Sequence, residues 1–96
     1  MKKVYWIAVY KDLKNPNNIK KYAEKASPAI KKYGGKILAR GGRVETIEGA
    51  PSPRTVLIEF SNMKDALNCY KSNEYQEALK YSVNSSNRHV VLVEGL

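Results

Sequence analysis

Residues 4–10 read Val-Tyr-Trp-Ile-Ala-Val-Tyr, and this stretch decides the fold of the chain. It is rich in β-branched and aromatic side chains, which favour an extended strand. Alternate side chains of a strand share a face, so Tyr5, Ile7 and Val9 oppose the other residues of the stretch. Because both faces are apolar, the sequence predicts a strand that is covered on both sides.

The predicted elements that follow this strand alternate between helices and strands. Asn15-Pro16 is typical of a helix N-cap with proline at the first helical position, and Gly34-Gly35 ends that helix. Inside the helix, Pro28 predicts a kink or a restart capped by Ser27. The other predicted elements are strands over Lys36–Arg40, Arg54–Phe60 and Arg88–Glu94, a resumed extended stretch over Arg43–Glu48, a helix capped by Asn62 and a short helix after Ser72-Asn73.

The resulting order β-α-β-β-α-β is the plan of α+β, ferredoxin-like folds, here as one domain over residues 1–96. In such a fold the helices cover only one face of the sheet. The first strand is apolar on both faces, and so is the last, where Val90 and Leu92 oppose Val91 and Val93. A second copy packed sheet against sheet would cover the remaining face. The sequence therefore predicts a homodimer.

Composition narrows the classes of function. The formal charge is +8, but 13 of the 17 basic residues are lysines, which favours a solvated helix surface over a nucleic-acid interface. Cys69 and His89 are the only residues of their types, which excludes an internal disulfide and a Cys/His zinc cluster. No apolar run approaches the roughly 18 residues of a membrane span, and no cleavage site follows the first strand. We expect a cytoplasmic protein that does not enter a membrane.

Several catalytic templates are missing from the sequence. It has no Gly-rich phosphate loop with Lys-Ser/Thr, no Gly-x-Ser-x-Gly elbow and no His-Glu-x-x-His motif. We therefore expect no metal and no cofactor. His89 fits a solvated position at the start of a strand, and Cys69 has no basic neighbours that would make its thiol nucleophilic.

The candidate ligand-binding groups are polar side chains at strand and helix positions. An arginine fork suits a carboxylate or enolate oxygen, and a tyrosine hydroxyl can donate to developing negative charge. Glu59 lies in an apolar strand and is a natural partner for an arginine, either in a pocket or as a structural pair. The pair Gly41-Gly42 is expected to aim Arg40. The candidate residues are Arg40, Arg54, Glu59, Tyr70, Tyr75 and Glu94, with Trp6 or Tyr5 as an apolar wall.

Short motifs across the whole chain add a family resemblance. They are Tyr5-Trp6, Tyr33-Gly34-Gly35, Leu38-Ala39-Arg40-Gly41-Gly42, Glu48-Gly49, Pro53-Arg54, Glu59-Phe60, Tyr70-Lys71-Ser72, Glu74-Tyr75-Gln76 and Val93-Glu94-Gly95. In order and spacing the chain resembles the domain of unknown function family 1330. That family is similar in fold to the dimeric α+β barrel superfamily, which includes cofactor-free monooxygenases, muconolactone isomerase-like proteins, haem peroxidases and stress-response barrels.

The resemblance also implies which positions of this chain carry the residues that recur in the family. The family's recurring residues correspond here to Arg40, Gly41, Gly42, Arg54, Glu59, Tyr70, Ser72, Tyr75 and Glu94. This chain departs from the family pattern at Cys69, where a tryptophan is usual, and around Lys80–Ser82, where an arginine is usual. The first change implies a larger or differently shaped pocket if that tryptophan lines one.

Together these features indicate a homodimer that binds a small organic acid or phenol. They leave open whether it also acts as a cofactor-independent enzyme. One alternative is an assembly dimer without a ligand. Another is an RNA-binding module of the RRM type, which has the same element order. An RRM needs exposed aromatic residues on its third strand, and Arg54–Phe60 offers only the terminal Phe60.

Overall fold

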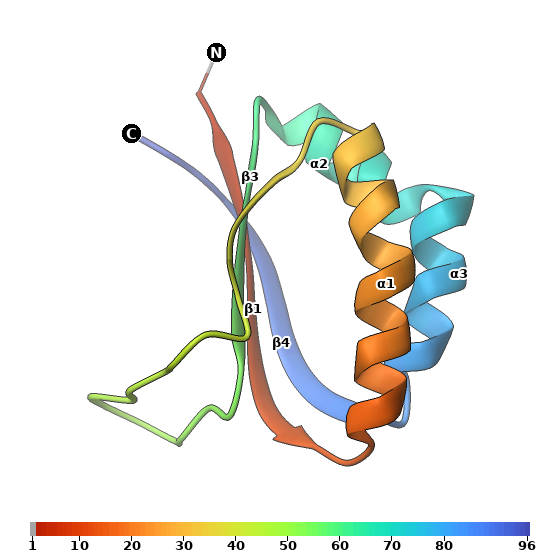
Figure 1. Ribbon diagram of the computed structural model, residues 1–96. Helices are drawn as coiled ribbons and strands as arrows, with labels where there is room; N and C mark the ends of the chain where they lie inside the picture. Colours follow the sequence, from red (N-terminus) through yellow and green to blue (C-terminus); the bar gives the residue numbers. More distant parts are fainter. Residues whose placement is uncertain (1) are drawn as a thin grey trace.

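The structure, a computed structural model, describes residues 2–96. Its elements are β1 (Val4–Leu13), α1 (Pro16–Lys32), β2 (Lys36–Arg40), β3 (Thr55–Phe60), α2 (Met63–Lys71), α3 (Asn73–Ser82) and β4 (Ser86–Glu94). The four strands form one sheet in the order β2-β3-β1-β4, and every neighbouring pair is antiparallel. All the helices lie against one face of this sheet (Figure 1). The predicted ferredoxin-like α+β fold is confirmed.

Helix α1 begins and ends where the sequence predicts. The side chain of Asn15 accepts a hydrogen bond from the backbone of Asn18 at 3.2 Å, and Gly34 leaves the helix with a φ of 86°. The predicted restart at Pro28 is wrong, since α1 runs unbroken to Lys32. Ser27 instead donates its hydroxyl to the carbonyl of Ala23 at 2.7 Å. Within residues 2–96, none of the helices is long and apolar enough to cross a membrane.

The stretch from Gly41 to Arg54 is an irregular loop, so the predicted extended segment over Arg43–Glu48 does not pair as a strand. The reason is its position. Strand β2 lies at the edge of the sheet, and the loop leaves that edge on the side away from the helices (Figure 1). Gly41 and Gly49 both adopt positive φ values, which turn the chain away from an extended path.

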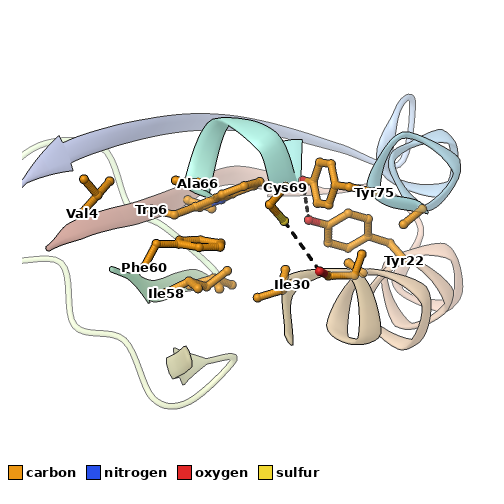
Figure 2. Packing of buried hydrophobic residues seen from close by; sticks show 14 of the residues in the cluster. Val4, Trp6, Tyr22, Ile30, Ile58, Phe60, Ala66, Cys69 and Tyr75 are labelled. Atoms are coloured by element: carbon orange, nitrogen blue, oxygen red, sulfur yellow. Dashed lines mark hydrogen bonds between the residues drawn. The ribbon is translucent and has the colours of Figure 1, made fainter. Parts of the chain in front are cut away.

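The core lies between the sheet and the helices. Its centre is Trp6, which stacks on Phe60 with ring centroids 6.1 Å apart and meets the edge of Tyr75 at 5.1 Å. Figure 2 shows this aromatic group together with Cys69 of α2, whose thiol faces the backbone of α1. The largest fully buried side chains are Trp6, Tyr10, Tyr75, Phe60, Ile58, Val4 and Cys69.

The opposite face of the sheet is mostly apolar but also carries Glu59 and His89, and within residues 2–96 no helix or strand covers it (Figure 1). Cross-strand pairing places Ile7 between Leu57 and Val91 on this face. Val91 is 38% exposed and Val93, opposite Tyr5, is 47% exposed. The prediction that the first and last strands are apolar on both faces, with helices on only one, is confirmed.

Candidate functional site: an arginine-lined cleft

A cleft of about 460 Å³ lies between α1 and the end of the sheet where β2 and β3 meet the 41–54 loop. Its apolar walls come from Leu13, Pro16 and Ile19. Its residues are Leu13, Pro16, Ile19, Lys20, Ala23, Glu24, Arg40, Gly41 and Arg54. Three of the four charged side chains are basic, so the cleft favours a negatively charged ligand.

Arg54 enters the cleft from the residue before β3. Its guanidinium carbon lies 5.5 Å from the ring centroid of Tyr10, a cation–π contact that orients the side chain. The buried Nε–H group of Arg54 has no hydrogen-bond acceptor within residues 2–96. Gly41 makes room for this side chain, since a Cβ atom there would lie 2.7 Å from Nη1 of Arg54. Gly41 thus makes room for Arg54, whereas the sequence predicted that the pair Gly41-Gly42 would aim Arg40.

Arg40 comes from the last residue of β2 and bridges to α1. Its Nη1 donates to the hydroxyl oxygen of Ser27 at 2.6 Å, and Ser27 in turn donates to the carbonyl of Ala23. This chain of hydrogen bonds fixes the serine as an acceptor for Arg40. The guanidinium of Arg40 remains exposed, so its other donors are available at the mouth of the cleft.

A second, inner cavity of about 20 Å³ adjoins the cleft and lies deeper between α1 and the sheet. Ala23, Arg40 and Arg54 line both spaces, which places the inner cavity next to the cleft. Its far wall carries Arg88 of β4. Its residues are Trp6, Ala8, Tyr10, Tyr22, Ala23, Ala26, Ile30, Ile37, Arg40, Arg54, Val56, Ile58 and Arg88.

Arg88 contacts three tyrosines in this interior. Its Nη1 donates to the hydroxyl oxygens of Tyr10 and Tyr22 at 3.3 and 3.2 Å, and its Nη2 donates to Tyr75 at 3.1 Å. The hydroxyls of Tyr22 and Tyr75 are 2.7 Å apart and hydrogen-bonded (Figure 2). The guanidinium also lies over the rings of Tyr22 and Tyr10, with distances of 4.9 and 5.6 Å to their centroids.

Burial governs the protonation of this cluster. It raises the pKa of Tyr75 far above its ordinary value, with the nearby Tyr22 adding to the effect, so Tyr75 stays a neutral phenol. Burial alone would lower the pKa of Arg88, but the surrounding phenol oxygens more than offset this and the pKa is raised. The interior therefore holds a fixed positive charge surrounded by hydroxyl groups.

The structure brings together four of the seven predicted site residues. Arg40 and Arg54 line the cleft, Trp6 lines the inner cavity, and Tyr75 lies behind Tyr22 in the hydroxyl cluster. The sheet between them and Glu59 separates that carboxylate from the cleft. Glu59 forms an ion pair with Lys3 at 3.2 Å and with no arginine within residues 2–96, so the predicted Arg–Glu pair is wrong.

The other two predicted residues lie elsewhere. Glu94 is exposed at the end of β4, in a surface depression shared with Lys2 and Asn62. Tyr70 is 42% exposed and packs against Trp6, with ring centroids 5.9 Å apart. It lines a separate groove of about 220 Å³ between α2 and β4. Neither residue reaches the arginine-lined cleft.

Sequence reasoning missed Arg88, Tyr10 and Tyr22 as site residues. A usable signal existed for Arg88, because strand alternation puts it on the same face as Val90 and Leu92, toward the helices. An arginine in phase with core residues must find partners in the interior. Tyr10 and Tyr22 fitted the apolar patterns of their strand and helix, so their hydroxyl groups gave no sign of a polar cluster.

Two residues with reactive side chains lie outside the cleft. His89 is exposed on the uncovered face of the sheet, opposite Val9. Cys69 is buried, and burial raises the pKa of its thiol to about 11. The thiol therefore stays protonated and unreactive near neutral pH. The uncovered face of the sheet presents Tyr5 as the aromatic residue of β1 and none from β3, which disfavours stacking of RNA bases.

Comparisons with known proteins agree with this architecture. The family described as "Domain of unknown function (DUF1330)" matches residues 3–96. No curated protein matches the chain. Among solved structures, a protein of unknown function from Rhodopseudomonas palustris superposes with a TM-score of 0.79 at 14% identity, covering 99% of this chain and 83% of that one.

Two further solved structures are similar in fold. A dimeric protein of unknown function with a ferredoxin-like fold, from Bacteroides fragilis, has a TM-score of 0.66 at 17% identity and covers 97% of this chain and 96% of that one. SnoaB, a cofactor-independent oxygenase from Streptomyces nogalater, has a TM-score of 0.73 at 6% identity and covers 100% of this chain and 95% of that one. At these identities the likeness concerns the fold alone.

Proposed function

The chain belongs to the DUF1330 family, and from this premise we propose that it is a homodimer that binds a small organic acid or phenol in the arginine-lined cleft. One observation carries the proposal. Arg40, Arg54 and Arg88 converge on the cleft and its inner cavity, and within residues 2–96 none of them pairs with a carboxylate within 4.0 Å. Their positive charge is available to a ligand.

The charges explain why the ligand is an anion. Removing a charged group from water is costly unless an opposite charge or several hydrogen bonds replace the lost solvation. Arg54 and Arg88 are both half-buried, and Arg88 has only neutral hydroxyl oxygens as partners. A carboxylate or phenolate would supply the missing negative charge, and the planar arginine fork suits two oxygens of a carboxylate.

The dimensions of the cleft explain why the ligand is small and partly apolar. Ligand sites typically measure about 300–1,000 Å³ and combine apolar walls with a few polar groups. At about 460 Å³ the cleft fits this range. Leu13, Pro16 and Ile19 contribute apolar lining to the cleft, which suits an aromatic ring or a short carbon chain.

Packing of the uncovered sheet face against a second copy completes the proposed assembly. A face built around Ile7, Leu57, Val91 and Val93 loses its contact with water only if another surface covers it. The fold neighbour from Bacteroides fragilis is described as dimeric, which supports a second copy as that surface. The proposed setting is the cytoplasm, where a single unpaired cysteine is usual.

The proposal includes chemistry that needs no cofactor. Guanidinium groups and phenol hydroxyls can stabilise negative charge that develops on a substrate oxygen. The fold neighbour SnoaB is described as a cofactor-independent oxygenase, which supports this extension for a phenolic substrate. The binding proposal stands without it, because a cleft that only binds an organic anion needs the same arginines.

Isothermal titration calorimetry tests the binding proposal. The ligands are benzoate, phenylpyruvate and 4-nitrophenol, with benzamide as the neutral counterpart of benzoate. We expect at least one anion to bind at least about tenfold more tightly than benzamide, and Arg54→Met to abolish this preference. Arg43→Met is the matched control, since Arg43 is exposed in the 41–54 loop and pairs with Glu45.

The alternatives give different results. A dimer that binds none of the three ligands, and whose Arg54→Met variant behaves like Arg43→Met, is an assembly dimer without a ligand. Tight, sequence-selective binding of RNA at physiological salt would instead favour a nucleic-acid module. Either result would contradict the proposed function.

A further inference from the structure

We propose that the inner cavity is an oxyanion site, which receives one oxygen of a carboxylate, enolate or phenolate bound in the cleft. The inference rests on the proposed function, and adds to it the position of the ligand's charged oxygen and the groups that select it. The positions of Arg88, Tyr10 and Tyr22 around the cavity carry the argument.

Hydrogen-bond donors outnumber acceptors around this cavity. A guanidinium donates and never accepts, and each phenol has one proton of its own to place. The oxygens of Tyr10, Tyr22 and Tyr75 already accept from Arg88. Their three protons therefore need acceptors elsewhere.

Only one of those protons has an acceptor within residues 2–96. Tyr22 and Tyr75 share a single hydrogen bond of 2.7 Å, which uses one proton of the two. The burial of Tyr75 keeps its phenol protonated, and it does not line the cavity. When Tyr75 donates to Tyr22, the proton of Tyr22 is left to point into the cavity. The hydroxyl proton of Tyr10 also lacks an acceptor, because within residues 2–96 the only hydrogen bond of this hydroxyl is the one it accepts from Arg88.

Arg54 adds a further donor to the cavity lining. Its buried Nε–H has no acceptor within residues 2–96, and its side chain lines the same cavity. The acidic residues nearby do not change this balance. Asp12, at the irregularity of β1, has a buried Oδ1 without a hydrogen-bond partner within residues 2–96, but it does not line the cavity. Glu24 lies in the outer cleft, and both carboxylates are more than 4.0 Å from all three guanidinium groups. A cavity surrounded by donors fits a group that only accepts, and an anionic oxygen is such a group.

The size of the cavity limits what can enter. A space of about 20 Å³ is close to the roughly 10–15 Å³ that one water molecule requires. A single oxygen atom fits, while a ring or a carbon chain does not. The body of the ligand therefore stays in the larger cleft, and only its terminal oxygen reaches Arg88 and Tyr22.

The ionisation of bound 4-nitrophenol tests this site, because the dye changes colour when it becomes 4-nitrophenolate. An oxyanion site binds the phenolate more tightly than the phenol, which lowers the pH at which the bound dye ionises. We expect a shift of at least about one pH unit relative to the free dye, which corresponds to a tenfold preference for the phenolate. The experiment is a spectroscopic pH titration of the dye with saturating dimeric protein.

Two matched variants separate a direct role from a structural one. Tyr22→Phe removes a hydroxyl that lines the cavity, and we expect it to lose most of the shift while still binding the dye. Tyr75→Phe removes a hydroxyl of the same cluster that does not line the cavity, and we expect it to retain the shift. Both changes keep the ring, so the aromatic packing around Trp6 is preserved.

The possible failures are distinguishable. If the dye binds the parent protein but ionises at its ordinary pH, the oxyanion site is wrong and the proposed function stands. Equal loss of the shift in both variants also overturns the oxyanion site, because the cluster would then act only through its overall structure. If neither 4-nitrophenol nor the carboxylates bind, both proposals fail.

Discussion

Replacing Gly41 with alanine tests how the backbone positions Arg54. Gly41 has a φ of 69°, in the left-handed region that costs a residue with a Cβ roughly 1–2 kcal/mol. The new Cβ would also lie 2.7 Å from Nη1 of Arg54. Ordinary contacts between non-bonded atoms are about 3.5–4.0 Å, so the guanidinium must move by nearly 1 Å. Because it ends a flexible side chain, it can move without unfolding the protein.

We expect two separable effects of Gly41→Ala. The free energy of unfolding falls by roughly 1–2 kcal/mol from the backbone strain. Affinity for the organic anion falls by about tenfold or more, since a hydrogen bond to a charged group contributes roughly 1.5–3 kcal/mol. Urea denaturation measures the first effect and isothermal titration calorimetry measures the second.

Gly42→Ala is the matched control for this prediction. A Cβ atom at Gly42 meets no atom within 4 Å, and its φ lies outside the left-handed region. We expect this variant to bind the anion like the parent protein and to be equally or slightly more stable. If Gly41→Ala loses stability but keeps full affinity, Arg54 does not contact the ligand and the reasoning is refuted.

Two further predictions concern the core and the assembly. Burial raises the pKa of Cys69 from 9.0 to about 11, so the unfolded chain releases this proton first as the pH rises. Between pH 9 and 11 the parent protein should therefore lose up to about 3 kcal/mol more stability than Cys69→Ala in urea titrations, because the loss from Tyr75, whose pKa burial also raises, is common to both. Val93→Glu places a charge on the uncovered sheet face, and sedimentation at low micromolar concentration should show it as a monomer where the parent is a dimer. A parent protein that sediments as a monomer would contradict the proposed assembly.

The order of elements could be predicted because local signals agreed with one another. Asn15 and Asn62 cap helices as expected, with Asn62 accepting from the backbone of Asp65 at 2.8 Å. The two apolar faces of β1 and β4 predicted helices on one side and an uncovered face on the other. These features depend on residues close in sequence or on strand alternation, which a sequence shows directly.

The path of the chain between β2 and β3 could not be predicted in the same way. Arg43–Glu48 has the composition of an extended segment, but a strand needs a partner. The free edge of β2 could have supplied one, but Gly41 and Gly49 adopt positive φ values and the loop turns away from that edge (Figure 1). Pro28 likewise removes one hydrogen bond from α1, yet packing of the helix on the sheet holds it as one unit.

The candidate site could be predicted only in part. The chemical affinity between glutamate and arginine argued for pairing Glu59 with an arginine, but the structure pairs Glu59 with Lys3 on the face away from the helices. Arg88 is in phase with the core, but its partners Tyr22 and Tyr75 come from α1 and α3, at separations of 66 and 13 residues. Such contacts depend on how the helices pack on the sheet, which local patterns do not specify.

The most direct test of the central claim is to observe the arginine side chains during ligand binding. Nitrogen-labelled protein gives an Nε–Hε resonance in the NMR spectrum for each of Arg40, Arg43, Arg54 and Arg88. When benzoate is added, we predict that the resonance of Arg54 moves most, because its buried Nε–H gains an acceptor, and that Arg43 stays in place. A spectrum in which Arg54, Arg40 and Arg88 do not move at saturating benzoate, phenylpyruvate or 4-nitrophenol would contradict the account.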